Sequence, residues 1–129
     1  MAVSLATTLR NTRADAITTY AGTSAKLRIY TASYATLLVE LICSGSAFAA
    51  GASGGVLTLN AVANGVAVAG GTAAIARFLK SDGSTMVIEG ITVTDSGGAG
   101  PLKLDQTGTT ISSGQTVSLS SGTITEGNP

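Results

Sequence analysis

Apolar positions in the first part of the chain recur at helical spacing. With 3.6 residues per turn, one face of such a helix would carry Leu5, Leu9, Ala16 and Tyr20. Ser4 is a suitable N-cap and Gly22 a suitable residue just past the C-terminus, so the pattern predicts one helix over residues 4–21. The opposite side is polar and is expected to face solvent or a partner, since it carries Arg10, Asn11, Arg13 and Asp15.

After Gly22 the apolar residues alternate with a period of two, which is typical of β-strands. Apolar side chains on both faces of the second predicted strand, 36–44, favour a central position in a sheet. The last predicted strand is expected to break near Gly122. In chain order, the predicted strands outside the hairpin described next are 26–31, 36–44, 56–62, 102–105, 109–112 and 115–125.

The clearest hairpin lies at residues 74–94, where two alternating apolar runs flank Ser81-Asp82-Gly83-Ser84. Asp-Gly is a strong turn signal because both residues tolerate positive φ. Together the elements predict a mainly β fold: an antiparallel β-sandwich, jelly-roll-like, with one N-terminal α-helix. We expect a helical arm over residues 1–22 and a sandwich domain over residues 23–129.

The composition favours packing over catalysis. Of 129 residues, 20 are Ala, 19 Thr, 17 Gly and 14 Ser, and charged residues make up 11%, against about 25% in ordinary domains. Histidine is absent and Cys43 is the single cysteine, which argues against imidazole-based catalysis, an internal disulfide or a multi-thiolate zinc site. We therefore expect no enzyme activity, no catalytic residues, no cofactor and no metal. Seven basic and seven acidic residues also predict no direct contact with nucleic acid.

No charged residue lies between Leu41 and Ala76. Residues 56–76 are long enough for a membrane helix, but Asn60, Asn64-Gly65 and Gly70-Gly71 interrupt them, so we expect no membrane span. The N-terminal residues do not resemble a secretory signal. A charge-free surface rich in small residues is instead expected to pack against another subunit, which indicates a homo-oligomer.

Other candidate sites have simpler interpretations. The glycine-rich segments 51–55 and 97–101 lack the lysine and flanking helix of a phosphate-binding loop, so we interpret both as loops. Cys43 is expected to be a buried small apolar residue. Three acidic residues are expected to stabilise turns and not to form an acid–base pair, namely Asp82, Asp95 and Asp105. Three tyrosines offer either core or interface packing or a sugar-stacking platform, namely Tyr20, Tyr30 and Tyr34.

Several stretches together resemble a family of short structural virion proteins of tailed double-stranded DNA bacteriophages. The link 32–35 is shorter than the glycine- and proline-containing loop usual in that family, so any contact made by that loop is not carried over. The stretches that carry the resemblance are LRNTRADAI (9–17), KLRIYT (26–31), AFAA (47–50), GGVLT (54–58), RFLKSDGS (77–84), ISSGQTVS (111–118) and TITEGN (123–128).

The resemblance implies a protein of the virion, assembled in the cytoplasm of the bacterial host, with the major capsid protein or other virion proteins as partners. A capsid decoration (cement) protein that binds over joints between capsid subunits is the first hypothesis. A neck, collar or tail component is the second, and a module that binds host glycans is the third. The expected subunit interface on the helix consists of Leu5, Leu9, Arg10, Arg13 and Tyr20.

Overall fold

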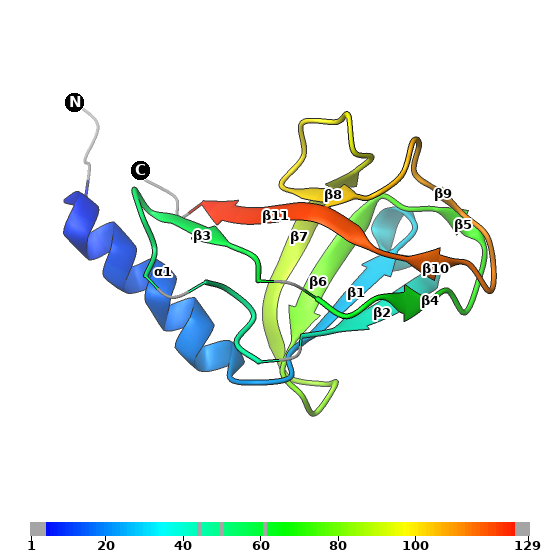
Figure 1. Ribbon diagram of the computed structural model, residues 1–129. Helices are drawn as coiled ribbons and strands as arrows, with labels where there is room; N and C mark the ends of the chain where they lie inside the picture. The colour runs from blue at the N-terminus through cyan, green and yellow to red at the C-terminus, as the bar shows by residue number, and fades with distance from the viewer. Residues whose placement is uncertain (1–4, 44, 50, 61, 126–129) are drawn as a thin grey trace.

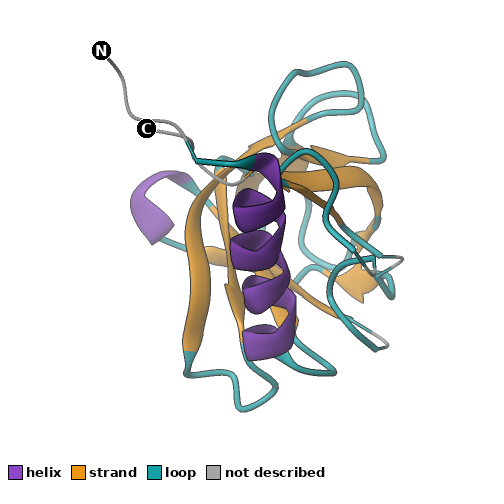
Figure 2. Ribbon diagram, turned by 90° about the vertical axis from the view of Figure 1, so that its left-hand side faces the viewer, coloured by secondary structure: helices purple, strands orange, loops and turns teal. Residues whose placement is uncertain are grey.

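The computed structural model describes residues 5–43, 45–49, 51–60 and 62–125. The helix α1 (Thr7–Ala21) precedes all the strands and lies beside them as a separate layer (Figure 2), and a single 3-10 turn, η1 (Ala32–Tyr34), follows β1. The strands are β1 (Lys26–Tyr30), β2 (Leu37–Ile42), β3 (Val56–Thr58), β4 (Gly65–Val66), β5 (Gly71–Thr72), β6 (Ile75–Leu79), β7 (Met86–Thr94), β8 (Leu102–Leu104), β9 (Thr110–Ile111), β10 (Thr116–Val117) and β11 (Leu119–Thr125). The prediction of a mainly β fold with one N-terminal helix is confirmed.

Seven strands form one curled sheet in the order β2-β1-β6-β7-β8-β11-β3 (Figure 1). Among the described residues, neighbouring strands are antiparallel except β7 and β8, which run parallel and pair at Val93 and Thr94. Two small ladders, β10-β4 and β5-β9, complete the described strands. The sheet is therefore a mixed half-barrel and not purely antiparallel as expected, because the glycine-rich loop 95–101 returns the chain in the direction of β7.

The expectation that residues 36–44 form a central strand is wrong for the seven-stranded sheet, because β2 is its terminal strand. The free edge of β2 is nevertheless covered. Ala63 donates its backbone N–H to the carbonyl of Ile42 at 3.3 Å, and Val68 donates to the carbonyl of Leu38 at 2.8 Å. The segment between them contains β4, so the chain that leaves β3 at one edge of the sheet runs along the other edge and curls the structure toward closure.

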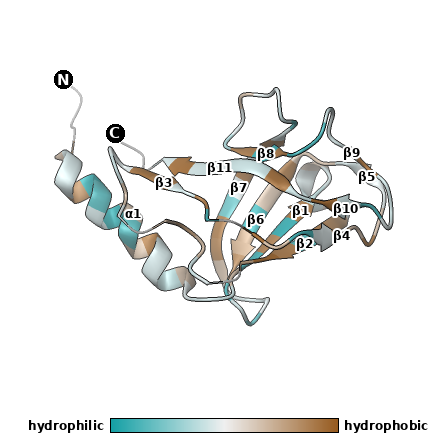
Figure 3. Ribbon diagram, viewed as in Figure 1, coloured by the Kyte–Doolittle hydropathy of each residue, from teal (hydrophilic) through white to brown (hydrophobic). Residues whose placement is uncertain are grey.

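Alternation along β1 sorts side chains between the core and the outer face. Leu27 and Ile29 are buried, whereas Lys26 and Arg28 are partly exposed, as the period of two predicts. The core also contains Phe48 and Phe78, whose ring centroids lie 5.4 Å apart. Figure 3 shows hydrophobic segments distributed over the strands, while α1 is mostly neutral or hydrophilic in colour. The core is therefore built mainly by the curled sheet.

The hairpin prediction is confirmed: β6 and β7 pair antiparallel around a turn at residues 80–85. One carboxylate oxygen of Asp82 accepts the backbone N–H groups of Ser84 and Thr85, both at 2.8 Å, and the other accepts the Thr85 hydroxyl. These hydrogen bonds, led by those from Thr85, hold the pKa of Asp82 well below its usual range. Gly83 supplies the positive φ of +74° that the turn requires.

The final strand breaks at a different residue from the one predicted. Ser118 separates β10 from β11, whereas Gly122 lies inside β11 and is buried. A Cβ atom at Gly122 would lie 2.9 Å from the Leu59 side chain and 3.1 Å from that of Leu102. Glycine is therefore used here for close packing between strands and not for a chain break.

Candidate functional site

The predicted interface residues mostly lie on the outward face of α1. Leu9 and Tyr20 are exposed to 47% and 51%, Arg13 is also exposed, and Leu5 and Arg10 are half-buried. Leu9, Arg13 and Tyr20 fall on one side of α1 at 100° per residue, whereas Leu5 precedes the helix and Arg10 turns toward the loop 51–55. The structure therefore presents an outward helix face of Leu9, Arg13 and Tyr20.

The opposite face of α1 packs on the protein itself, so the expectation that the polar residues are turned outward is wrong for Asn11 and Asp15, whereas Arg13 is exposed. Ala14 is buried, Asn11 accepts the Gly55 N–H at 2.7 Å, and Asp15 accepts the Ala52 N–H at 2.8 Å. These side chains give the loop 51–55 the acceptors that its backbone needs. Two loop amides that a phosphate-binding loop would offer to a ligand are thus already used.

Tyr30 and Tyr34 form a compact cluster with Arg77. The two rings meet edge to face with centroids 5.3 Å apart, and the Arg77 guanidinium lies 4.7 Å from each centroid. Arg77 also donates to the Tyr30 hydroxyl, and the Tyr34 hydroxyl accepts the Gly90 N–H at 2.7 Å. Because Tyr30 is only 6% exposed, this arrangement chiefly joins η1 to β6 and β7.

Tyr20 does not join the other two tyrosines. Its ring instead lies 4.0 Å from the ammonium group of Lys80, at the end of β6 where the hairpin turn begins. The single sugar-stacking platform considered from the sequence is therefore divided between two places, one on α1 and one around Arg77.

The three candidate turn acids lie in turns and loops. Asp82 caps the hairpin turn, Asp95 accepts the N–H groups of Gly97 and Gly108, and Asp105 has a long contact of 3.5 Å with the Ser118 hydroxyl. In the described ranges, no group of three or more His, Cys, Asp or Glu residues is placed to hold a metal ion. None of the described helices is long and apolar enough to cross a membrane.

Cys43 is free and buried at the end of β2, as predicted. Burial raises the pKa of its thiol, because the low-polarity surroundings disfavour the thiolate. The thiol is therefore neutral at physiological pH and contributes through packing.

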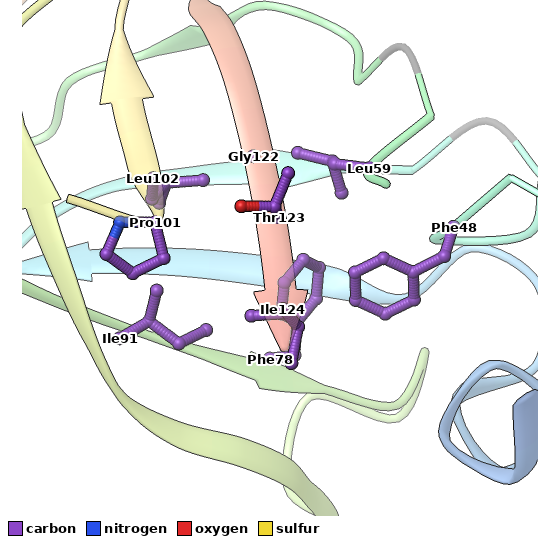
Figure 4. Close-up of a pocket in the computed structure, with 9 residues that line it drawn as sticks. All are labelled: Phe48, Leu59, Phe78, Ile91, Pro101, Leu102, Gly122, Thr123 and Ile124. Atoms are coloured by element: carbon purple, nitrogen blue, oxygen red, sulfur yellow. The ribbon is translucent and has the colours of Figure 1, made fainter. Parts of the chain in front are cut away.

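A groove between β7 and the end of β11 has a volume of about 340 Å³. Its sides are the β7 segment Ile88–Ile91 and the β11 segment Thr123–Thr125, and Pro101 also lines it. Beneath it lies a void of about 10 Å³ against Phe48 and Phe78 (Figure 4). The groove therefore has strands as walls and an apolar floor that includes Ile91 and Ile124, and its lining offers no nucleophile–base pair.

Sequence reasoning missed this groove, because it depends on which strands become neighbours. The available local signal was Pro101 directly before a short apolar run, since proline cannot donate to a strand ladder. The Arg77 cluster was also missed, because Tyr30 and Arg77 are far apart in sequence and meet only through the pairing of β1 with β6.

No family model, curated protein or solved structure matches the chain.

Proposed function

We propose that this chain is a structural protein of a tailed bacteriophage particle, and specifically a decoration protein that binds over joints between major capsid subunits. The proposal rests on the sequence resemblance together with one structural observation: α1 leaves two large apolar side chains exposed. Leu9 and Tyr20 are exposed, whereas Ile17 of the same helix packs against the core. A helix with two large apolar side chains in solvent has an unused contact face.

A second exposed apolar pair supports the same proposal. Val66 and Val68 are exposed to 61% and 69%, and they lie in the segment without charged residues that covers the β2 edge. Docking at such a surface requires little desolvation of charge. With several copies joined as a homo-oligomer, weak contacts at each copy would add up to firm attachment.

In this proposal the protein acts by binding and has no catalytic step, cofactor, nucleic-acid contact or membrane contact. It is assembled onto the particle in the bacterial cytoplasm. The proposal also keeps the sandwich interpretation, with the β10-β4 and β5-β9 ladders as a second layer that stiffens the curled sheet under load.

Band stoichiometry on gels of purified particles tests the proposal directly. Hundreds of copies per particle are expected for decoration of a shell, whereas about six to a few dozen copies would move the protein to the neck or tail. Particles stripped of the protein should lose resistance to heat and osmotic shock, because each copy opposes separation of the subunits beneath it. Absence of the protein from purified particles would overturn the proposal.

A further inference from the structure

We propose that the groove between β7 and β11 binds an extended, neutral to basic peptide segment of a partner protein as an added β-strand. The inference goes beyond the role in the virion and does not depend on it. It rests on strand edges that face each other across the groove, on the proline that ends the strand between them, and on the residues that line the floor and rim.

The first observation concerns the direction of the β11 backbone groups. Leu59 donates to the Gly122 carbonyl at 2.8 Å, so Gly122 faces β3, and Thr123 donates to the Pro101 carbonyl at 2.9 Å, so Thr123 faces β8. Backbone groups alternate along a strand. Thr125 therefore points its N–H and carbonyl to the same side as Thr123, into the groove.

The second observation is the place where β8 stops. In the antiparallel register of β11 with β8, Thr123 stands opposite Pro101. A hydrogen-bonded pair normally exchanges two bonds, but proline has no N–H, so β8 returns none to the Thr123 carbonyl. Just before Pro101 the chain turns away, with the Gly100 N–H donated to the Thr94 hydroxyl at 3.3 Å. The position that a longer β8 would occupy is therefore left open.

The opposite wall is β7. Within the described residues, β8 pairs with β7 only at Val93 and Thr94, so Ile88–Ile91 has no strand partner on the side away from β6. The Gly90 N–H is already donated to the Tyr34 hydroxyl, so an added strand would use the other backbone groups of this segment. A segment that continued the line of β8 would thus lie between two strand edges. This is the geometry of strand addition, in which backbone hydrogen bonds supply affinity and alternate side chains supply selectivity.

The lining specifies the chemistry of the added strand. Ile91 and Ile124 line both the groove and the void above the phenylalanine pair, so an inward side chain of the peptide meets an apolar floor. At the rim Glu89 is exposed and makes no ion pair with a described residue. A peptide with alternating β-branched apolar residues and flanking basic residues therefore fits, and an acidic peptide is disfavoured.

The probe is an acetylated and amidated peptide, Lys-Val-Thr-Val-Lys, titrated into the isotope-labelled full chain and followed by backbone amide NMR. We expect saturable shifts confined to the amides of Ile88–Ile91 and Thr123–Thr125, with a Kd of about 1 mM. The same peptide methylated on alternate backbone nitrogens should show at least about tenfold weaker binding, because it cannot donate to the strand edges. Glu-Val-Thr-Val-Glu should also bind more weakly.

Two protein variants separate backbone recognition from simple apolar contact. Thr125→Pro removes the N–H that faces the groove while leaving the β3 ladder its donors, and should weaken binding about tenfold. Thr125→Val keeps that N–H and should bind like the parent. Absence of saturable shifts up to about 10 mM peptide, shifts centred elsewhere, or equal binding of the methylated peptide would overturn the proposal. These outcomes hold whether or not the chain is found on particles.

Discussion

At the scale of single residues, Asp82 is the clearest case of a side chain that fixes local structure. Its carboxylate accepts three hydrogen bonds from the turn that it starts, and its lowered pKa reflects how much better these donors bind the charged form. Stability from a carboxylate with a lowered pKa is present above the unfolded-state pKa, about 3.9, and is lost as the pH falls toward the folded-state pKa.

Asp82→Ala should therefore lower the thermal unfolding midpoint at pH 7, because the turn amides and the Thr85 hydroxyl lose their acceptor. The difference from the parent should shrink as the pH falls below about 4, because the Asp82 carboxylate of the unfolded parent takes up a proton there while the folded one is still ionised. Thermal melts monitored by circular dichroism at pH 7 and pH 3 measure both effects.

Asp105→Ala is the matched control, because that carboxylate has a single long contact with Ser118 and its loss should change the midpoint less. A difference between Asp82→Ala and the parent that stayed equal at both pH values would contradict the assignment of the turn's stability to the ionised carboxylate.

At the scale of elements, strongly alternating segments could be predicted from the sequence, and segments that depend on distant neighbours could not. The ranges of β1, β2, β6 and β7 follow from local alternation and the Asp-Gly turn. The strands β4 and β5 have two residues each, in a segment of Gly, Ala and Val that carries no clear period. The inward face of α1 was misassigned because it is held by the small buried Ala14 and by hydrogen bonds from the loop 51–55 to Asn11 and Asp15, none of which hydrophobic spacing reveals.

Asn11→Ala tests how α1 is held on the sheet. The Gly55 N–H would lose its partly buried acceptor, which should cost about 1–2 kcal/mol in the free energy of unfolding. Urea titration measures that loss, and hydrogen exchange should show faster exchange at the Gly55 amide.

Thr12→Ala on the outward side is the control. Its hydroxyl bonds only the Thr8 carbonyl in its own helix, and alanine favours helix, so the unfolding free energy should stay equal or rise slightly. If the Gly55 amide of Asn11→Ala exchanged its hydrogen as slowly as in the parent, the Asn11 side chain would not be what holds α1 on the loop 51–55.

Gly65→Ala tests the closure of the sheet at β2. A Cβ atom at this position would lie 2.5 Å from the Glu40 carbonyl oxygen and 2.7 Å from the Leu41 side chain, so β4 must move away from β2. Overpacking of this kind should cost about 1–3 kcal/mol, measured by urea titration.

Gly45→Ala is the matched substitution, since a Cβ atom at Gly45 meets nothing within 4 Å and should leave the unfolding free energy nearly unchanged. Equal stability of the two variants would mean that β4 is not pressed against β2, and the half-barrel would then be open at that edge.

At the scale of the whole molecule, the described core is apolar while several large apolar side chains remain exposed. The buried core contains no charged residue among the described positions, and the ion pairs of Glu40 with Arg28 and Lys26 lie on the outer face of the sheet. The outward apolar residues of α1 therefore contribute little to folding. In the proposed function these residues act through contacts with another molecule.

In the proposed function, docking therefore uses side chains of α1 that lie outside the core. In the double variant Leu9→Asp, Tyr20→Asp, each substitution should change the free energy of unfolding by no more than about 0.5 kcal/mol, because neither side chain belongs to the core. Its occupancy on particles, measured by co-sedimentation and gel densitometry, should fall at least about tenfold, since two carboxylates would lose water on docking.

Thr19→Asp is the control, because it adds a charge on the exposed flank of the same helix and should retain occupancy. Full occupancy of the double variant would remove α1 from the docking surface and leave Val66 and Val68 as the contact to test, because they are the most exposed large apolar side chains among the described residues.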